Sequence, residues 1–436
     1  MLAALAVGCS KPGAYDRAYV SSGIEGRLGI GIGPGAKPGE TAIPEGVTAE
    51  DGLTEDEAVA VALWNNPGFQ EALAELGIAR ADLRQAGLLP NPVLSVLFPL
   101  GPKQLEFAAK WPLEALWLAP RRAEAARLDC ERVAAQLIQH GLDLARDVRV
   151  TYADLLLARR RAEIAGAYEA TCRRIAELEE ARLAGGDASP IEAMGARTEA
   201  LRAREERDRL EREVGIVEGR LRALLGLGLE RCPVFFSPSS PGLPPVPAEV
   251  DGLLEAAMAA RPDLRAAEFA VEAAGERAGL ARWEWLSISG ILDANDRKGK
   301  EGLELGPGLE ALLPLFDFGG GRAARADAAL EKAARRYAAV RHRIAAEVRE
   351  AHARFRRAAG ELEAWRQKII PALEAAAARC EKAKDAGEVA AREVLEARLR
   401  LLEARVREAE AAAEARRSRA ELERSVGMRL ERGEGK

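Results

Sequence analysis

The residues of this chain whose types could do chemistry form no recognisable catalytic or metal site. Asp317-Phe318-Gly319 matches the magnesium motif of protein kinases, but no His-Arg-Asp motif or glycine-rich loop accompanies it, so we interpret it as a turn before a helix. The three histidines (His140, His342 and His352) lack the spacing of metal ligands, and the four methionines offer no ladder of soft ligands. The sequence therefore predicts no enzyme, no metal site and no cofactor.

The five cysteines include no Cys-x-x-Cys pair, which argues against a zinc ribbon. Cys130, Cys172 and Cys380 lie in segments expected to be helical, where a small apolar residue packs well. Cys9 follows an apolar stretch and Gly8, in a pattern similar to a bacterial lipoprotein signal, although no basic residue precedes it. We predict that residues 1–9 are a partial lipoprotein signal and that Cys9 is lipidated.

Composition narrows the class of protein further. The chain has 436 residues and a net charge of −5. This acidic balance argues against a nucleic-acid partner, because neutralising phosphates requires an excess of Lys and Arg. No apolar run approaches the length of about 18 residues that suggests a membrane-spanning helix. Residues 10–52 are rich in Gly and Pro, and we expect a linker there rather than a nucleotide site at the glycine run of residues 29–35.

The sequence contains two copies of one unit of about 200 residues. Residues 65–69 recur, with changes, as residues 260–264. Farther along, the apolar positions Val133, Leu137, Leu144, Val148 and Leu155 recur at residues 333, 337, 344, 348 and 355, an offset of 200. Beyond them the offset is 201: Gly186 and Glu192 recur as Gly387 and Glu393, and Leu225-Gly226 recurs as Val426-Gly427. A nearly constant offset indicates an internal duplication.

Each repeat is expected to contain the same elements. A short helix (54–65 or 250–260) ends before a proline, because the residue before proline disfavours the helical conformation. A second helix (67–87 or 262–283) precedes two extended stretches, a very long helix (about 121–183 or 322–383), a glycine-containing turn and a return helix. The spacing of 4 and 7 residues in the long helix predicts coiled-coil packing. We predict a first repeat at 53–226, a proline-rich connector at 227–249, a second repeat at 250–427 and a tail at 428–436.

The extended stretches alternate between apolar and polar residues, which predicts β-hairpins at about 92–112 and 286–314. Phe107, Ala109 and Trp111 alternate with Glu106, Ala108 and Lys110. Four strands leave open edges that lipid does not tolerate, and membrane barrels begin at about eight strands. Three chains would together supply twelve strands, enough to close a barrel. The fold class that follows is mainly α with a small β part.

The sequence resembles the TolC-like family of outer-membrane efflux factors over about Leu53 to Gly427. The resemblance is carried by residues 53–92 (LTEDEAVAVALWNNPGFQEALAELGIARADLRQAGLLPNP), by Pro314-Leu315-Phe316-Asp317-Phe318-Gly319-Gly320-Gly321-Arg322 and by the Leu-Gly and Val-Gly endings of the two repeats. The sequences of residues 64–67 and 87–92 most resemble those of the branch associated with heavy-metal cation exporters. The resemblance implies a homotrimer, with a 12-stranded barrel in outer-membrane lipid and a trimeric α-barrel that forms a periplasmic tunnel.

The same resemblance implies partners and site residues. The partners are a periplasmic adaptor protein and an inner-membrane pump of the RND type, which supplies the energy. The adaptor-contact tip corresponds to Gly185, Gly186, Asp187, Ala188 and Ser189 in the first repeat, and to Gly387, Glu388, Val389 and Ala390 in the second. Glu393 and Glu396 match an acidic ring just inside the tunnel entrance of some relatives, and the first repeat keeps only Glu192. Val389 stands where some relatives have a gating Arg.

Two other functions remain open on the sequence alone. One is the outer-membrane duct of a type I protein secretion system, which uses the same architecture with an ABC transporter. The other is a soluble coiled-coil scaffold whose two hairpins cap a helical bundle. The reading favoured by the resemblance is a lipid-anchored exit duct in the outer membrane of a Gram-negative bacterium.

Overall fold

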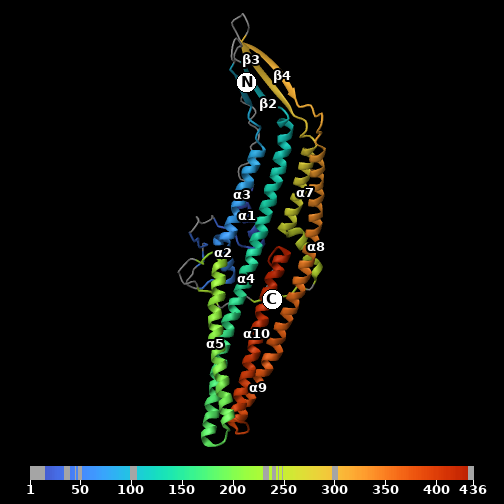
Figure 1. Ribbon diagram of the computed structural model, residues 1–436. Coiled ribbons are helices and arrows are strands. Elements are labelled where there is room, and N and C mark those ends of the chain that lie inside the picture. Colours follow the sequence, from blue (N-terminus) through green and yellow to red (C-terminus); the bar gives the residue numbers. More distant parts are fainter. Residues whose placement is uncertain are drawn as a thin grey trace. The chain divides into compact units, whose positions relative to one another are not determined.

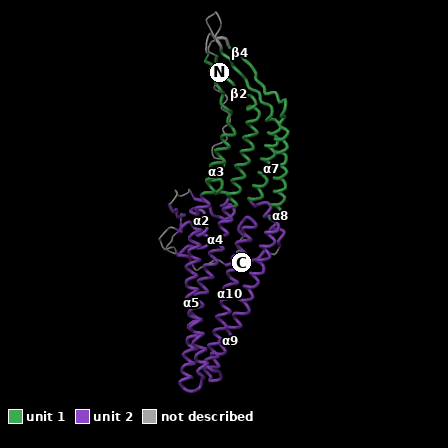
Figure 2. The backbone as a smooth tube through the Cα atoms, in the orientation of Figure 1, with its two compact units in different colours: residues 1–22, 71–139, 262–343 green, residues 23–70, 140–261, 344–436 purple. Residues whose placement is uncertain are grey.

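The computed structural model divides into two compact units, each of which contains parts of both repeats (Figure 2). Unit 1 comprises residues 1–22, 71–139 and 262–343, and unit 2 comprises residues 23–70, 140–261 and 344–436. The residues that the structure describes are 15–33, 40–44, 46–47, 52–98, 106–228, 235–237, 242–243, 245–247, 249–296 and 303–430. Cys9, the predicted lipidation site, lies outside these residues.

The two repeats form the same order of elements (Figure 1). The first contains α2 (Glu55–Asn65), α3 (Pro67–Ala86), β1 (Val93–Leu97), β2 (Glu106–Pro112), α4 (Ala115–Gly185) and α5 (Pro190–Leu224). The second contains α6 (Val250–Ala260), α7 (Pro262–Ala281), β3 (Ile288–Asp296), β4 (Leu303–Ala311), α8 (Gly320–Ala364), a π-helical segment η1 (Trp365–Ile369), α9 (Ile370–Asp385) and α10 (Ala391–Val426). A mainly helical fold with a small sheet is therefore confirmed.

The π-helical segment explains why the offset between the repeats changes from 200 to 201. In the first repeat α4 is continuous through the matching stretch, whereas the second repeat has η1 between Phe355 and Gly387. Within η1 the Ile370 N–H donates to the Trp365 carbonyl, five residues back instead of four. A π turn accommodates one additional residue in a helix without breaking it. The extra residue of the second repeat is therefore absorbed at η1.

The four strands form one antiparallel sheet in unit 1, in the order β1-β2-β3-β4. The central pair, β2 and β3, joins the two repeats, with Phe107 opposite Ala294 and Ala109 opposite Leu292. Because paired residues share a face, the register makes one face apolar; it carries Leu94, Val96, Phe107, Ala109, Trp111, Ile288, Leu292, Ala294, Leu305, Pro307, Leu309 and Ala311. The opposite face carries all the charged strand side chains that the structure describes, namely Glu106, Lys110, Asp293 and Glu310.

The predicted heptad seam is buried in unit 2. Leu144, Val148 and Leu155 of α4 are almost fully buried, as are their counterparts Ile344, Val348 and Phe355 of α8. In both helices the buried residues follow one another at intervals of four and seven residues, as the sequence predicts for coiled-coil packing.

The N-terminal region contains a helix that the sequence analysis missed. We expected only linker between residues 10 and 52, but α1 spans Arg17–Leu28. Its apolar residues Val20, Ile24 and Leu28 are buried at four-residue spacing, which is the face of one helix. Three residues give a weak periodic signal, and the glycines and prolines that follow hid it. Residues 30–33 of the glycine run carry no helix or strand, and residues 34–35 lie outside the described residues.

Candidate tip and gate site

The two helical hairpins of unit 2 end in turns with the same backbone geometry, and both turns lie at the same end of the unit (Figure 1). Gly186 has φ of +83° and Gly387 has φ of +76°, the left-handed region that glycine adopts without strain. The Asp187 N–H donates to the Arg182 carbonyl at 2.8 Å, and the Glu388 N–H donates to the Ala383 carbonyl at 2.8 Å. Most of the nine residues predicted for the adaptor-contact tip are exposed in these turns.

The helices that leave the two turns are capped differently. Ser189 and Glu192 form a reciprocal capping box at the start of α5: the Ser189 N–H donates to Glu192 Oε2 at 2.8 Å, and the Glu192 N–H donates to Ser189 Oγ at 3.2 Å. These hydrogen bonds lower the pKa of the Glu192 carboxyl below its usual range. In the second repeat Ala390 stands in place of Ser189, so α10 has no side-chain cap.

The predicted gate residues Glu393 and Glu396 lie in the first two turns of α10. Arg392 Nε donates to Glu396 at 2.9 Å, and this hydrogen bond is the largest cause of a raised pKa of Arg392. No ion pair of the Glu393 carboxylate occurs among the residues that the structure describes. The two glutamates therefore share a helix, but Glu396 is bound to an arginine.

Arg392 also joins the two hairpins, a contact that the sequence analysis did not predict. Its Nη1 donates to Glu179 of α4 at 3.1 Å. Glu179 is only 1% exposed and also accepts from Arg182 at 3.0 Å. The i, i+4 spacing of Arg392 and Glu396 could have indicated the first contact, but nothing local in the sequence indicates Glu179. Val389, where some relatives have a gating Arg, lies in the turn three residues before Arg392.

A groove of about 1320 Å³ lies between the two hairpins of unit 2, away from the turns. Its apolar lining includes Tyr168 of α4, Leu201 of α5 and Trp365 and Ile369 of η1. Arginine and glutamate side chains form most of the remaining lining of the groove. Among them, Arg407 pairs with Glu410 at 3.0 Å.

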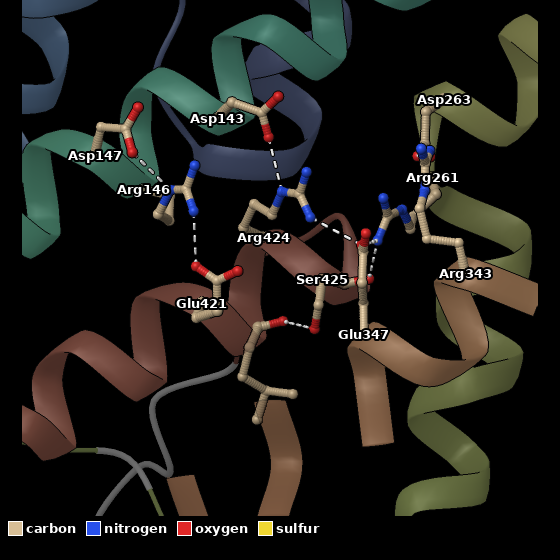
Figure 3. Close-up of polar contacts among 11 residues, drawn as sticks. Asp143, Arg146, Asp147, Arg261, Asp263, Arg343, Glu347, Glu421, Arg424 and Ser425 are labelled. Atoms are coloured by element: carbon tan, nitrogen blue, oxygen red, sulfur yellow. Dashed lines mark hydrogen bonds and ion pairs between the residues drawn. The ribbon is translucent and has the colours of Figure 1, made fainter. Parts of the chain in front are cut away.

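Ion pairs hold the repeats together at the other end of α10 (Figure 3). Arg424 donates to Asp143 of α4 at 2.7 Å and to Glu347 of α8 at 2.8 Å, so it bridges the two repeats. Glu347 also accepts from Arg261 at 2.6 Å, and Arg261 donates to the Ser425 carbonyl at 3.1 Å. These contacts fix the position of the α10 C-terminus relative to both long helices.

The remaining chemical candidates have structural explanations. Asp317 Oδ1 accepts from the Gly319 N–H at 2.8 Å in the turn before α8, as the sequence predicts. His352 is buried and makes a 2.7 Å hydrogen bond with the Pro247 carbonyl of the connector. Burial raises the pKa of the Cys172 thiol to about 11, which makes it a poor nucleophile. Within the described ranges no three His, Cys, Asp or Glu side chains are grouped so as to hold a metal ion.

None of the helices in the described part of the chain is long and apolar enough to cross a membrane.

Comparison with known proteins shows which families and structures the chain resembles. A family model described as "outer membrane efflux protein" matches residues 253–428. Among solved structures, the outer-membrane channel OprN is similar over 90% of this chain and 94% of its own, with a TM-score of 0.69 and 22% identity. CusC, a protein that forms a transmembrane channel, is similar over 91% of this chain and 98% of its own, with a TM-score of 0.70 and 19% identity. The outer membrane protein VceC from Vibrio cholerae is similar over 86% of this chain and 97% of its own, with a TM-score of 0.68 and 18% identity. No curated protein matches.

Proposed function

We propose that this chain, which resembles the TolC-like outer membrane efflux protein family, is the exit duct of an efflux system and is assembled from three copies. In this assembly the sheets of unit 1 form a 12-stranded barrel in the outer membrane, and the helical hairpins of unit 2 form a tunnel in the periplasm. The duct is passive. Energy for transport comes from an inner-membrane pump.

The one-sided sheet is the observation that carries this proposal. Twelve apolar side chains occupy one face, and Leu305 and Leu309 there are 64% and 75% exposed. The opposite face carries the charges, including the pair between Lys110 and Glu310. A wall that is apolar outside and polar inside is the pattern of membrane barrels. The edge strands β1 and β4 lack a second partner within the chain's described strands, and pairing between copies would satisfy them.

The exposed turns of unit 2 support the second part of the proposal, which is docking to a periplasmic adaptor. Gly185, Gly186, Asp187, Ala188 and Ser189, together with Gly387, Glu388, Val389 and Ala390, are the proposed contact residues. An RND-type pump is the proposed inner-membrane partner. Glu393 and Glu396, with Glu192 from the first repeat, are proposed as the acidic residues at the tunnel entrance, where threefold symmetry would arrange them around one axis.

Heavy-metal cations are the proposed cargo, and lipid at Cys9 is the proposed anchor in the outer membrane. The support for this cargo is the resemblance of residues 64–67 and 87–92 to the heavy-metal branch. We propose no metal-ligating residue in this chain, because no three His, Cys, Asp or Glu side chains are grouped among the described residues.

The proposal is tested by placing a charge on each face of the sheet. Leu309→Arg puts a cation on the apolar face, where it costs about 2–4 kcal/mol at the bilayer midplane. Ser95→Arg puts the same charge on the polar face and is the matched control. We expect Leu309→Arg to abolish the membrane-inserted trimer and Ser95→Arg to retain it. Equal assembly of both variants would contradict the proposed barrel.

A further inference from the structure

The groove between the two hairpins of unit 2 has a volume of about 1320 Å³, which leaves room for an organic molecule of drug size. Its lining comes from α4, α5, η1, α9 and α10. This lining includes none of the residues proposed for the tip or for the acidic ring. The proposed exit duct therefore gives the groove no task.

Apolar and aromatic side chains form the walls of the groove. Trp365, Ile369 and Leu373 line it from the second hairpin, and Tyr168 and Leu201 line it from the first. Leu201 is 61% exposed, so the wall presents apolar surface to a ligand. The faces of the two rings also attract cations, because the π electrons concentrate negative charge there. The walls therefore suit a ligand that is both apolar and positively charged.

The arginines in the lining are mostly engaged by glutamates of the same groove. Four of the five form ion pairs, which are Arg161–Glu410, Arg407–Glu410, Arg209–Glu206 and Arg202–Glu199. An anionic ligand would have to compete with these carboxylates for the same guanidinium groups. The lining therefore does not favour an anion.

The glutamates in the lining are less fully engaged. Three of the six, Glu205, Glu213 and Glu403, make no ion pair among the described residues, and Arg400 is the one lining arginine in the same position. Burial, the Cys172 thiol and the carboxylates of Glu403 and Glu199 raise the pKa of the Tyr168 hydroxyl. Tyr168 therefore combines a ring face with two neighbouring carboxylates, and both attract a cation.

We propose that this groove is a binding site for a lipophilic organic cation. The charged centre of the ligand lies over the ring of Tyr168, beside Glu403, and its apolar substituents contact Trp365 and Ile369. The metal cations proposed as cargo are a different class of ligand, since they require convergent ligating atoms instead of apolar walls. The inference is independent of the proposed function, because a single chain supplies every residue of the lining.

Calorimetric titration of the purified full chain in a neutral detergent tests the site with two probes, tetraphenylphosphonium and tetraphenylborate. These ions have nearly the same size and shape and carry opposite charges, so they separate apolar binding from recognition of charge. Titration into detergent alone measures uptake by the micelles. We expect saturable binding of one tetraphenylphosphonium per chain, at least about tenfold tighter than binding of tetraphenylborate. Equal binding of the two ions, or no saturable binding of the cation, would overturn the proposal.

Two exposed residues on the same face of α10 provide matched variants. Glu403→Gln removes a carboxylate beside Tyr168 and should weaken binding of tetraphenylphosphonium about threefold. Arg400→Gln removes a positive charge from the same groove and should leave binding unchanged or make it tighter. Both side chains are exposed, so neither substitution disturbs the packing of the helices. The same loss of binding in both variants, or no loss in Glu403→Gln, would contradict recognition of the cation by this carboxylate.

Discussion

Glu192 and Glu393 occupy equivalent positions in the two repeats, six residues after Gly186 and Gly387, but only Glu192 is bound by the fold. Ser189 and Glu192 cap α5 together, whereas α10 begins at Ala390 without a side-chain cap. The duplicated glutamate therefore caps a helix in the first repeat but not in the second. The carboxylate of Glu192 is therefore engaged in helix capping, whereas that of Glu393 is not.

Neutralising the second-repeat glutamates is expected to change ion selectivity. In planar bilayers, Glu393→Gln combined with Glu396→Gln should reduce cation selectivity and weaken block by multivalent cations, because a ring of carboxylates attracts cations. Glu381→Gln, which neutralises an exposed glutamate of α9 outside the proposed ring, is the control and should leave selectivity unchanged. Unchanged selectivity in the double variant would exclude the proposed gate.

Removing the arginine that joins the hairpins is expected to loosen the tip. Arg392→Gln releases Glu396 and leaves the buried Glu179 with Arg182 as its remaining ion-pair partner among the described residues. We predict a higher open probability in bilayers and faster amide exchange at the start of α10. Arg398→Gln is an exposed control on the same helix, and it should resemble the unaltered chain. If Arg392→Gln opened no more often than Arg398→Gln, the ion pair would have no role in closing the tip.

Acidification is expected to weaken the α5 cap and leave α10 unchanged. The hydrogen bonds with Ser189 lower the pKa of Glu192 in the folded chain, so the cap stabilises above the ordinary glutamate pKa of 4.5 and is lost as pH falls through the lowered value. Exchange at residues 190–193, corrected for its intrinsic pH dependence, should report the loss. Ser189→Ala should produce the same loss at neutral pH, about 1 kcal/mol of helix stability. A pH response of equal size in α10 would show that capping is not its cause.

The glycines that end the two repeats are expected to resist substitution. Gly226 has φ of +73°, and a Cβ there would lie 2.2 Å from the Asn65 carbonyl oxygen. Gly226→Ala should therefore cost more than the 1–2 kcal/mol, roughly, of a left-handed backbone alone. Gly360→Ala, in open space within α8, should instead stabilise by about 1 kcal/mol. Thermal unfolding of the two variants in detergent measures the difference, and similar shifts would contradict this explanation of the Leu-Gly ending.

The sequence predicts the elements of each repeat well because their signals are local. The helix expected at 54–65 is α2, which begins at Glu55 with Thr54 as its cap, and α6 begins and ends at the residues expected. The buried Val148 and Val348 follow from the 4 and 7 spacing. In each case the residues that define the element lie within it or directly beside it.

The contacts that the sequence did not reveal join residues far apart in the chain. The pairing of β2 with β3 places Phe107 opposite Ala294, and Arg392 reaches Glu179 across 213 positions. No local pattern encodes such partners. The π turn could be predicted in part. The sequence shows that the offset between the repeats changes from 200 to 201, but only the backbone shows that the extra residue lies at η1.

The central claim is that three copies of this chain close into one channel in the outer membrane. It is tested most directly by fractionating cells, extracting the membranes in mild detergent and determining the mass of the protein by light scattering. We predict a trimer, about three times the chain mass of 46.8 kDa, in the outer-membrane fraction. A monomer or dimer in the aqueous fraction would contradict the claim and favour the coiled-coil scaffold.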